Sequence, residues 1–206
     1  YTQRSFAGEN MNATVNYRSS RTFLSVKLRQ NHNKGAVDEN YIIAQQQKNQ
    51  TSNTKRIDTY NNYGANITFE QQLSSASTIG AVYDFSYGRD NIDTDNRYSY
   101  MSDNALDSLL TTQSLQKGIT RVHTLNAYYD LKLDTLGKKL GFVINYMHHS
   151  PDKDVNFTTL NHSNGAKAVV REPNDIAYQI WTSEANLELP FPWLNIETGV
   201  KYSDIR

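Results

Sequence analysis

Alternation of apolar and polar residues is the feature that most restricts the fold of this chain. In the stretch 190–202, Leu194, Ile196, Val200 and Tyr202 share one parity, and mainly polar residues occupy the other. A period of two indicates a β-strand whose successive side chains point to opposite faces. The pattern returns at 63–73, 78–88, 124–133 and 182–190, and in shorter form at 13–17, 24–28 and 140–146. The sequence therefore predicts about eight strands.

The connections between these strands are of two kinds. Four are short turns, at 18–21, 74–77, 134–139 and 190–193, with centres about 55 to 60 residues apart. Between them lie three long polar tracts, at 30–62, 89–120 and 150–177, which we expect to be loops. Long loops are uncommon inside a compact domain, whereas short turns that alternate with long loops are typical of outer-membrane barrels. The predicted fold is all-β, an antiparallel up-and-down meander of about eight long strands, part of a large outer-membrane β-barrel.

The alternation also predicts which residues share a face of the sheet. One face should carry apolar side chains toward lipid: Tyr63, Phe69, Ile79, Tyr83, Phe85, Leu125, Tyr129, Ile144, Leu187 and Ile196. The other should carry charged side chains toward a water-filled or plugged lumen: Glu70, Asp84, Asp130, Lys132, Glu184 and Glu197. A slip of one residue in register would exchange the two sets, so coordinates test this prediction directly.

Composition excludes several classes of protein. Lys plus Arg and Asp plus Glu number 21 each, so no net charge attracts nucleic acid, and there is no basic stripe. The chain has no Cys, which rules out disulfides, thiolate metal sites and a Cys nucleophile. The chain has no run of about 18 apolar residues, so the sequence predicts no membrane helix. The 14 Tyr residues suit a pleated sheet.

Residues with potential chemistry are few. The pair His148-His149 lacks further ligands at a suitable spacing, and the Asp-rich tract 89–107 lacks the Gly and the closing Glu of a calcium loop. We expect no enzyme activity, no cofactor and no metal site. The candidate ligand-binding residues lie in the second long tract: Asp93, Asp95, Tyr98 and Tyr100. The tyrosines could stack on a sugar or a chelate ring, or the tract could simply extend the strands beyond the membrane.

Several stretches resemble the barrel region of TonB-dependent receptor-like outer-membrane proteins of Bacteroidetes type. They are "ATVNYRSSRTFLSVKL", "NNYGANITFEQQLSSASTIGAVYDFSYG", "HTLNAYYDLKLDTLGKKLGFVINY" and "TSEANLELPFPWLNIETGVKYS". The resemblance implies a barrel of about 22 strands, plugged by an upstream domain, that imports a nutrient with energy from the inner membrane. On this interpretation residues 1–206 are a partial barrel domain, without the plug and the remaining strands.

The expected partners follow from that interpretation. They are outer-membrane lipid, the TonB system through parts of the protein outside this chain, and a nutrient ligand whose identity the sequence does not give. The alternatives are a soluble or surface-exposed β-sheet ligand-binding module and a complete eight-stranded barrel. Eight strands cut from a larger barrel would have two unpaired edges, so we expect the isolated chain to self-associate.

Overall fold

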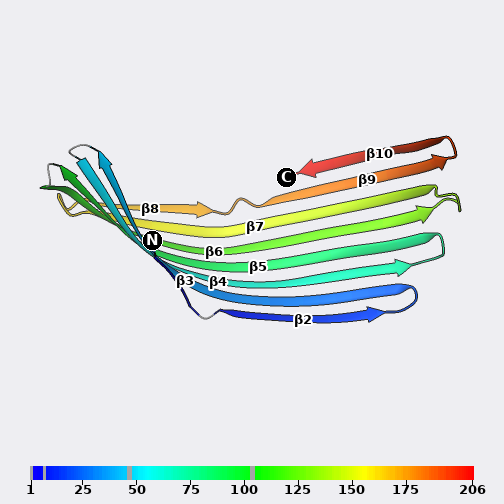
Figure 1. The fold of residues 1–206 in the computed structure, drawn as a ribbon, viewed down its shortest axis with the longest axis horizontal. Coiled ribbons are helices and arrows are strands. Elements are labelled where there is room, and N and C mark those ends of the chain that lie inside the picture. Colours follow the sequence, from blue (N-terminus) through cyan, green and yellow to red (C-terminus); the bar gives the residue numbers. More distant parts are fainter. Residues whose placement is uncertain (1, 7, 46–47, 103–104) are drawn as a thin grey trace.

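The chain forms one antiparallel sheet (Figure 1). The computed structural model describes residues 2–6, 8–45, 48–102 and 105–206. The strands are β1 (Thr2–Ser5), β2 (Glu9–Arg18), β3 (Thr22–Gln45), β4 (Lys48–Gln72), β5 (Ser77–Ser102), β6 (Ala105–Lys132), β7 (Lys139–Asn161), β8 (Lys167–Asn174), β9 (Tyr178–Phe191) and β10 (Leu194–Ile205). Among these residues no helix is long and apolar enough to cross a membrane.

The ten strands occupy eight positions in the sheet. β1 and β2 pair with different halves of β3, and β8 and β9 pair with different halves of β7. β1 and β2 therefore share one position beside β3, and β8 and β9 share one position beside β7. This leaves eight positions, which follow the order of the sequence. This confirms the predicted antiparallel meander of about eight strands.

A proline marks the place where β8 and β9 separate. β9 pairs with β7 as far as His149, and β8 pairs with it from Lys153. Pro151 lies in the gap and is paired only with Thr120 of β6. Proline has no N–H to donate to a ladder and is tolerated where a partner strand is missing.

The long polar tracts are mostly strand, so their assignment as loops was wrong. β3 to β7 contain 24, 25, 26, 28 and 23 residues. A tilted strand crosses a bilayer with about 9–11 residues. The 26 residues of β5, at about 3.3 Å each, span roughly 85 Å. The structure therefore agrees with the alternative that the second tract extends the strands, and the other two tracts do the same.

The four short turns are confirmed, and polar side chains stabilise three of them. The Ser19 hydroxyl accepts a hydrogen bond from the Thr22 amide (3.0 Å), and Ser74 accepts one from Ser77 (3.1 Å). The Asp134 carboxylate accepts two, from Leu136 and Lys138 (2.9 and 3.0 Å). These bonds lower the pKa of Asp134, with the Lys138 amide contributing most.

The register confirms the predicted faces. Directly paired residues share a face, and the pairs Ile67–Tyr83, Tyr83–Leu125, Leu125–Tyr146 and Tyr146–Trp181 place one row of apolar side chains across five strands. All ten residues predicted for this side follow the same parity, and the six charged residues follow the other. We call the two sides the apolar face and the polar face.

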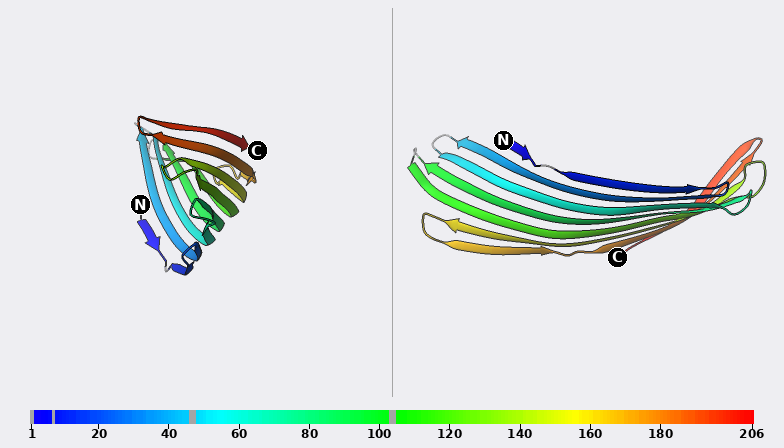
Figure 2. Two further views of the ribbon diagram at one scale, coloured as in Figure 1. Left: turned by 90° about the vertical axis from the view of Figure 1, so that its right-hand side faces the viewer. Right: turned by 90° about the horizontal axis from the view of Figure 1, so that it is seen from below.

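The sheet is a single curved and twisted layer (Figure 2), and its described residues form no apolar core. Large apolar side chains such as Val15, Ile144 and Val200 are exposed on the apolar face. The described residues that are buried all lie on the polar face: Ser25, Gly64, Gly80, Asp90, Gly118 and Pro151. The polar face is therefore the crowded side of the sheet, and the apolar face has no protein partner among the described residues.

Aromatic residues mark one limit of the apolar band. On five strands we take the apolar-face aromatic residue that lies farthest from the short turn. The next residue of the same face, two positions farther from the turn, is polar, for example Asn61, Arg89 or Asp204. These aromatics are Tyr63, Tyr87, Tyr146, Trp181 and Tyr202. We call them the aromatic girdle, because such rings gather where a barrel leaves the lipid.

Candidate functional site

Glycine makes room for long side chains that cross the polar face. Gly80 on β5 lies between Glu70 on β4 and Tyr128 on β6. The Tyr128 hydroxyl donates a 2.6 Å hydrogen bond to Glu70 Oε2, across the intervening strand. A Cβ on Gly80 would lie 2.5 Å from Tyr128 Cε1, inside contact distance. The bridge therefore requires glycine at this position.

The same arrangement occurs at Gly64. It lies on β4 between Arg29 on β3 and Ser86 on β5. The Arg29 guanidinium donates to both oxygens of Asp84, at 2.9 and 3.2 Å. A Cβ on Gly64 would lie 2.8 Å from Arg29 Cζ. This second bridge again connects strands that are not neighbours.

A third bridge lies farther along the polar face, beyond the aromatic girdle. Gly118 on β6 separates Asp90 on β5 from Lys153 on β7, and the two charges form an ion pair of 3.6 Å. Asp90 is only 8% exposed and also accepts a 2.6 Å hydrogen bond from Gln116 Nε2. An acid this buried needs such partners, because an unpaired charge is costly to desolvate.

Two hollows meet beside Asp90 and form the candidate site. One, of about 420 Å³, is lined by residues that include Tyr60, Asp90 and Lys153. The other, of about 510 Å³, has a more apolar wall that includes Tyr98 and Phe157. Both are lined by Ile92 and Gln116. We call the combined hollow the polar-face groove.

The groove offers varied contacts. Arg56 forms a 3.0 Å ion pair with Asp58 at one side. Partial burial of the hydroxyl, with the carboxylates of Asp58 and Asp90, raises the pKa of Tyr60, and Arg56 opposes the effect. Aromatic rings, amides and both signs of charge suit binding of a polar ligand.

The structure divides the four predicted ligand-binding residues between the two faces. Asp93 and Asp95 have the parity of Tyr83 and Phe85, so they lie on the continuation of the apolar face. Tyr98 and Tyr100 have the parity of Asp84 and lie on the polar face. One ligand cannot contact all four from one side of the sheet.

Each of the two tyrosines lies in a different hollow. Tyr98 lines the polar-face groove, where its hydroxyl accepts a 3.0 Å hydrogen bond from Asn96 Nδ2. Tyr100 lines a separate hollow of about 350 Å³ nearer the ends of the long hairpins. Of the four predicted residues, Tyr98 alone lines the groove.

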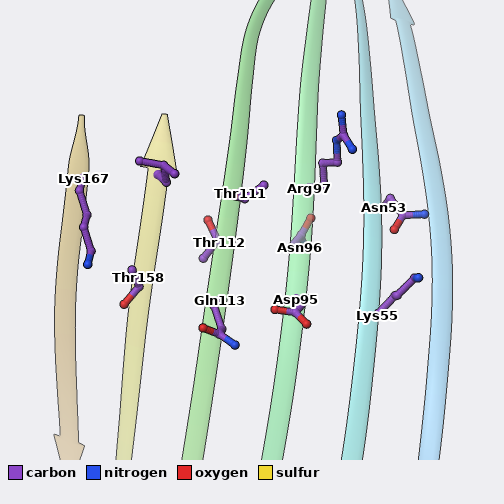
Figure 3. A pocket seen from close by; sticks show the side chains of 11 residues that line it. Asn53, Lys55, Asp95, Asn96, Arg97, Thr111, Thr112, Gln113, Thr158 and Lys167 are labelled. Atoms are coloured by element: carbon purple, nitrogen blue, oxygen red, sulfur yellow. The ribbon is translucent and has the colours of Figure 1, made fainter. Parts of the chain in front are cut away.

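Asp95 belongs to another groove on the apolar-face side, beyond the girdle (Figure 3). This groove, of about 540 Å³, also contains Lys55, Arg97 and Lys167. It is slightly larger than either polar-face hollow. Lys55, Asp95 and Arg97 have the parity of the apolar face, whereas the buried polar residues lie on the other face.

Sequence reasoning missed most of the polar-face groove. Arg56, Gln116, Lys153 and Phe157 come from three strands whose pairing is visible only in the register. Their parity was the available signal, because it continues the parity of the charged residues nearer the turns. The described residues contain no cluster of three potential metal ligands.

Residues 131–206 match the outer membrane protein beta-barrel family. This match confirms the expected location in the outer membrane and agrees with the all-strand fold. No curated protein matches the chain.

Two solved structures are similar in part. The RagAB peptide importer in its open-open state is 9% identical, with a TM-score of 0.47, and the match covers 95% of this chain and 31% of that one. BauA, the ferric preacinetobactin receptor from Acinetobacter baumannii, is 10% identical, with a TM-score of 0.37, and the match covers 98% of this chain and 41% of that one. The chain thus spans less than half the length of either protein.

Proposed function

We propose that this chain is a segment of an outer-membrane TonB-dependent receptor that imports a nutrient, and that the polar-face groove lines the ligand's path. On this proposal the eight strand positions form part of a larger closed barrel. The remaining strands, the plug and the segment that contacts TonB belong to other parts of the protein.

The unequal character of the two faces carries the proposal. Every described residue that is buried lies on the polar face, where charged side chains are bridged across strands. Large apolar side chains are exposed on the opposite face. A soluble sheet would cover those side chains with a second layer. A barrel wall instead turns them to lipid and turns the polar face to an aqueous interior.

The open sheet also bears on the size of the barrel. β2 and β10 lie at opposite edges, and within the described residues neither pairs with the other. A complete eight-stranded barrel would join these edges. Nothing in the pairing favours that alternative, whereas further strands of a larger barrel would satisfy both edges.

The experiment compares two double variants of the full-length protein in cells. Tyr98→Ala with Phe157→Ala alters the polar-face groove, and Asp93→Asn with Asp95→Asn alters the same level of the other face. Uptake of labelled peptides, ferric chelates and oligosaccharides is measured with and without an uncoupler. We expect one class to be imported only in energised cells, and the groove variant to reduce import roughly threefold to tenfold through lost aromatic contacts.

The control variant should import that ligand at the wild-type rate. Equal loss in both variants would show that the groove has no special role. Import that persists in uncoupled cells would refute TonB-dependent transport. Both variants must reach the outer membrane in wild-type amounts for the comparison to count.

A further inference from the structure

A group of three basic residues lies on the apolar-face side, at the aromatic girdle and just beyond it. Arg89 is the next residue of this face after Tyr87 on β5. Its direct partner on β6 is Ile119, and Lys117 and Arg121 lie two residues to either side of Ile119. Diagonal neighbours of this kind are about 7–8 Å apart, so the three long side chains can reach one small anion.

The charges of these three residues are available to a ligand. All three side chains are exposed, and none forms an ion pair within the described part of the chain. Asp154, directly opposite Lys117, is instead held by Arg171 at 2.9 Å. The neighbouring Asp152 and Asp93 oppose two of the three positive charges, which leaves an excess of one basic charge.

The height of the group relative to lipid is set by its aromatic neighbours. The Arg121 guanidinium lies over the Tyr87 ring, 5.9 Å from its centre. Tyr87 in turn contacts Tyr63, with ring centres 6.2 Å apart. Aromatic residues of a girdle lie at the level of the lipid headgroups. The basic residues are therefore placed where headgroup phosphates would be.

We propose that Arg89, Lys117 and Arg121 form a binding site for the phosphate of an anionic lipid headgroup in the outer leaflet. Guanidinium groups match phosphate in geometry and in charge. The Tyr87 ring would lie beneath the bound headgroup and hold Arg121 in place. Arg89 also borders one hollow of the polar-face groove, whereas Lys117 and Arg121 line neither hollow. The lipid site rests on the membrane location and not on nutrient transport.

The test measures lipid retained by the full-length protein. The protein is placed in phosphatidylcholine nanodiscs that contain lipid A, washed in detergent, and analysed for lipid A that remains bound. The triple variant Arg89→Gln, Lys117→Gln, Arg121→Gln should reduce the retained lipid A by a factor of at least about ten. Each basic residue near an anionic surface contributes roughly fivefold to the affinity. Asp152→Asn should retain more lipid than the wild type.

A matched variant separates site-specific binding from loss of charge. Lys55→Gln, Arg97→Gln, Lys167→Gln removes three basic residues from the same side of the sheet, farther from the girdle. It should retain lipid A like the wild type. Equal loss in both triple variants, or no loss in the first, would overturn the proposal.

Two further arms identify the chemistry. Lipid A stripped of its phosphates should not be retained, and retention equal to that of intact lipid A would exclude a phosphate site. A large excess of inorganic phosphate should leave the bound lipid in place, since the acyl chains add affinity. Complete displacement by inorganic phosphate would show a site for free anions and refute the lipid proposal.

Discussion

Replacing Gly80 with alanine should destabilise the barrel by displacing Tyr128. The new Cβ would lie 2.5 Å from Tyr128 Cε1 and closer still to the end of the ring, so the ring must move. Its 2.6 Å hydrogen bond to Glu70 would then break.

The expected magnitude follows from two opposing effects. A hydrogen bond to a charged group contributes about 1.5–3 kcal/mol, and the exposure of Glu70 favours the lower end. Alanine restricts the unfolded chain more than glycine does, which raises the free energy of unfolding by about 0.4–1 kcal/mol. Gly80→Ala should therefore lower the free energy of unfolding by about 1 kcal/mol. Gly35→Ala in β3, where a Cβ meets nothing within 4 Å, should be neutral or stabilising.

A double-mutant cycle tests the cause, using denaturant unfolding of the full-length protein in detergent micelles. Tyr128→Phe removes only the hydroxyl, and should cost about 1.5 kcal/mol in the wild type and almost nothing beside Gly80→Ala. An equal cost of Tyr128→Phe in both backgrounds would refute the bridge. So would a Gly80→Ala protein as stable as Gly35→Ala.

Three other predictions concern the faces, an ion pair and the edges. Ile67→Arg puts a charge on the apolar face and should lower the free energy of unfolding in micelles by about 2–4 kcal/mol. Asn66→Arg puts the same charge on the polar face and should lower it far less. Equal losses in the two variants would contradict the face assignment. The hydrogen bond from Arg171 lowers the pKa of Asp154. This bond should therefore stabilise β8 fully at a pH above the usual pKa of a carboxyl group, and the stabilisation should be lost as the pH falls through the lowered pKa. Amide exchange in β8, corrected for intrinsic rates, should then rise in acid, but not in Asp154→Asn. The isolated chain should self-associate in water without detergent, and a monodisperse monomer in light scattering would contradict this.

Local patterns were sufficient to predict the turns and the faces. Alternation near Ile67 and Tyr83, and turn chemistry at Ser74 and Asp134, are read within a few residues of chain. Where both faces meet water, however, alternation disappears, because nothing requires one side to be apolar. Strands in tracts such as 89–120 therefore have the composition of loops.

The candidate site was harder to predict because it depends on register between distant segments. Gly118 has no signal of its own until Asp90 and Lys153 are known to flank it. The four predicted ligand residues were chosen by closeness in sequence, which places Asp95 and Tyr98 on opposite faces of one strand. Parity along β5 would have separated them.

The slant of the aromatic girdle gives an independent measure of strand tilt. Tyr87 on β5 is in register with Ser150 on β7 through Arg121, yet the girdle residue of β7 is Tyr146, four residues nearer the short turn.

On β9 the girdle residue Trp181 is the direct partner of Tyr146. On β10 the girdle residue Tyr202 is opposite Ser183, two residues nearer the short turn than Trp181. Tyr63 on β4 is in register with Tyr87, so the girdle crosses five strand spacings from β4 to β10. Six residues correspond to roughly 20 Å along the strands, and five spacings to roughly 24 Å across them. The strands are therefore tilted by about 40°, within the tilt of about 35–45° in membrane barrels. Because a closed barrel requires tilted strands, the positions of the girdle residues support a curved barrel wall independently of the family match.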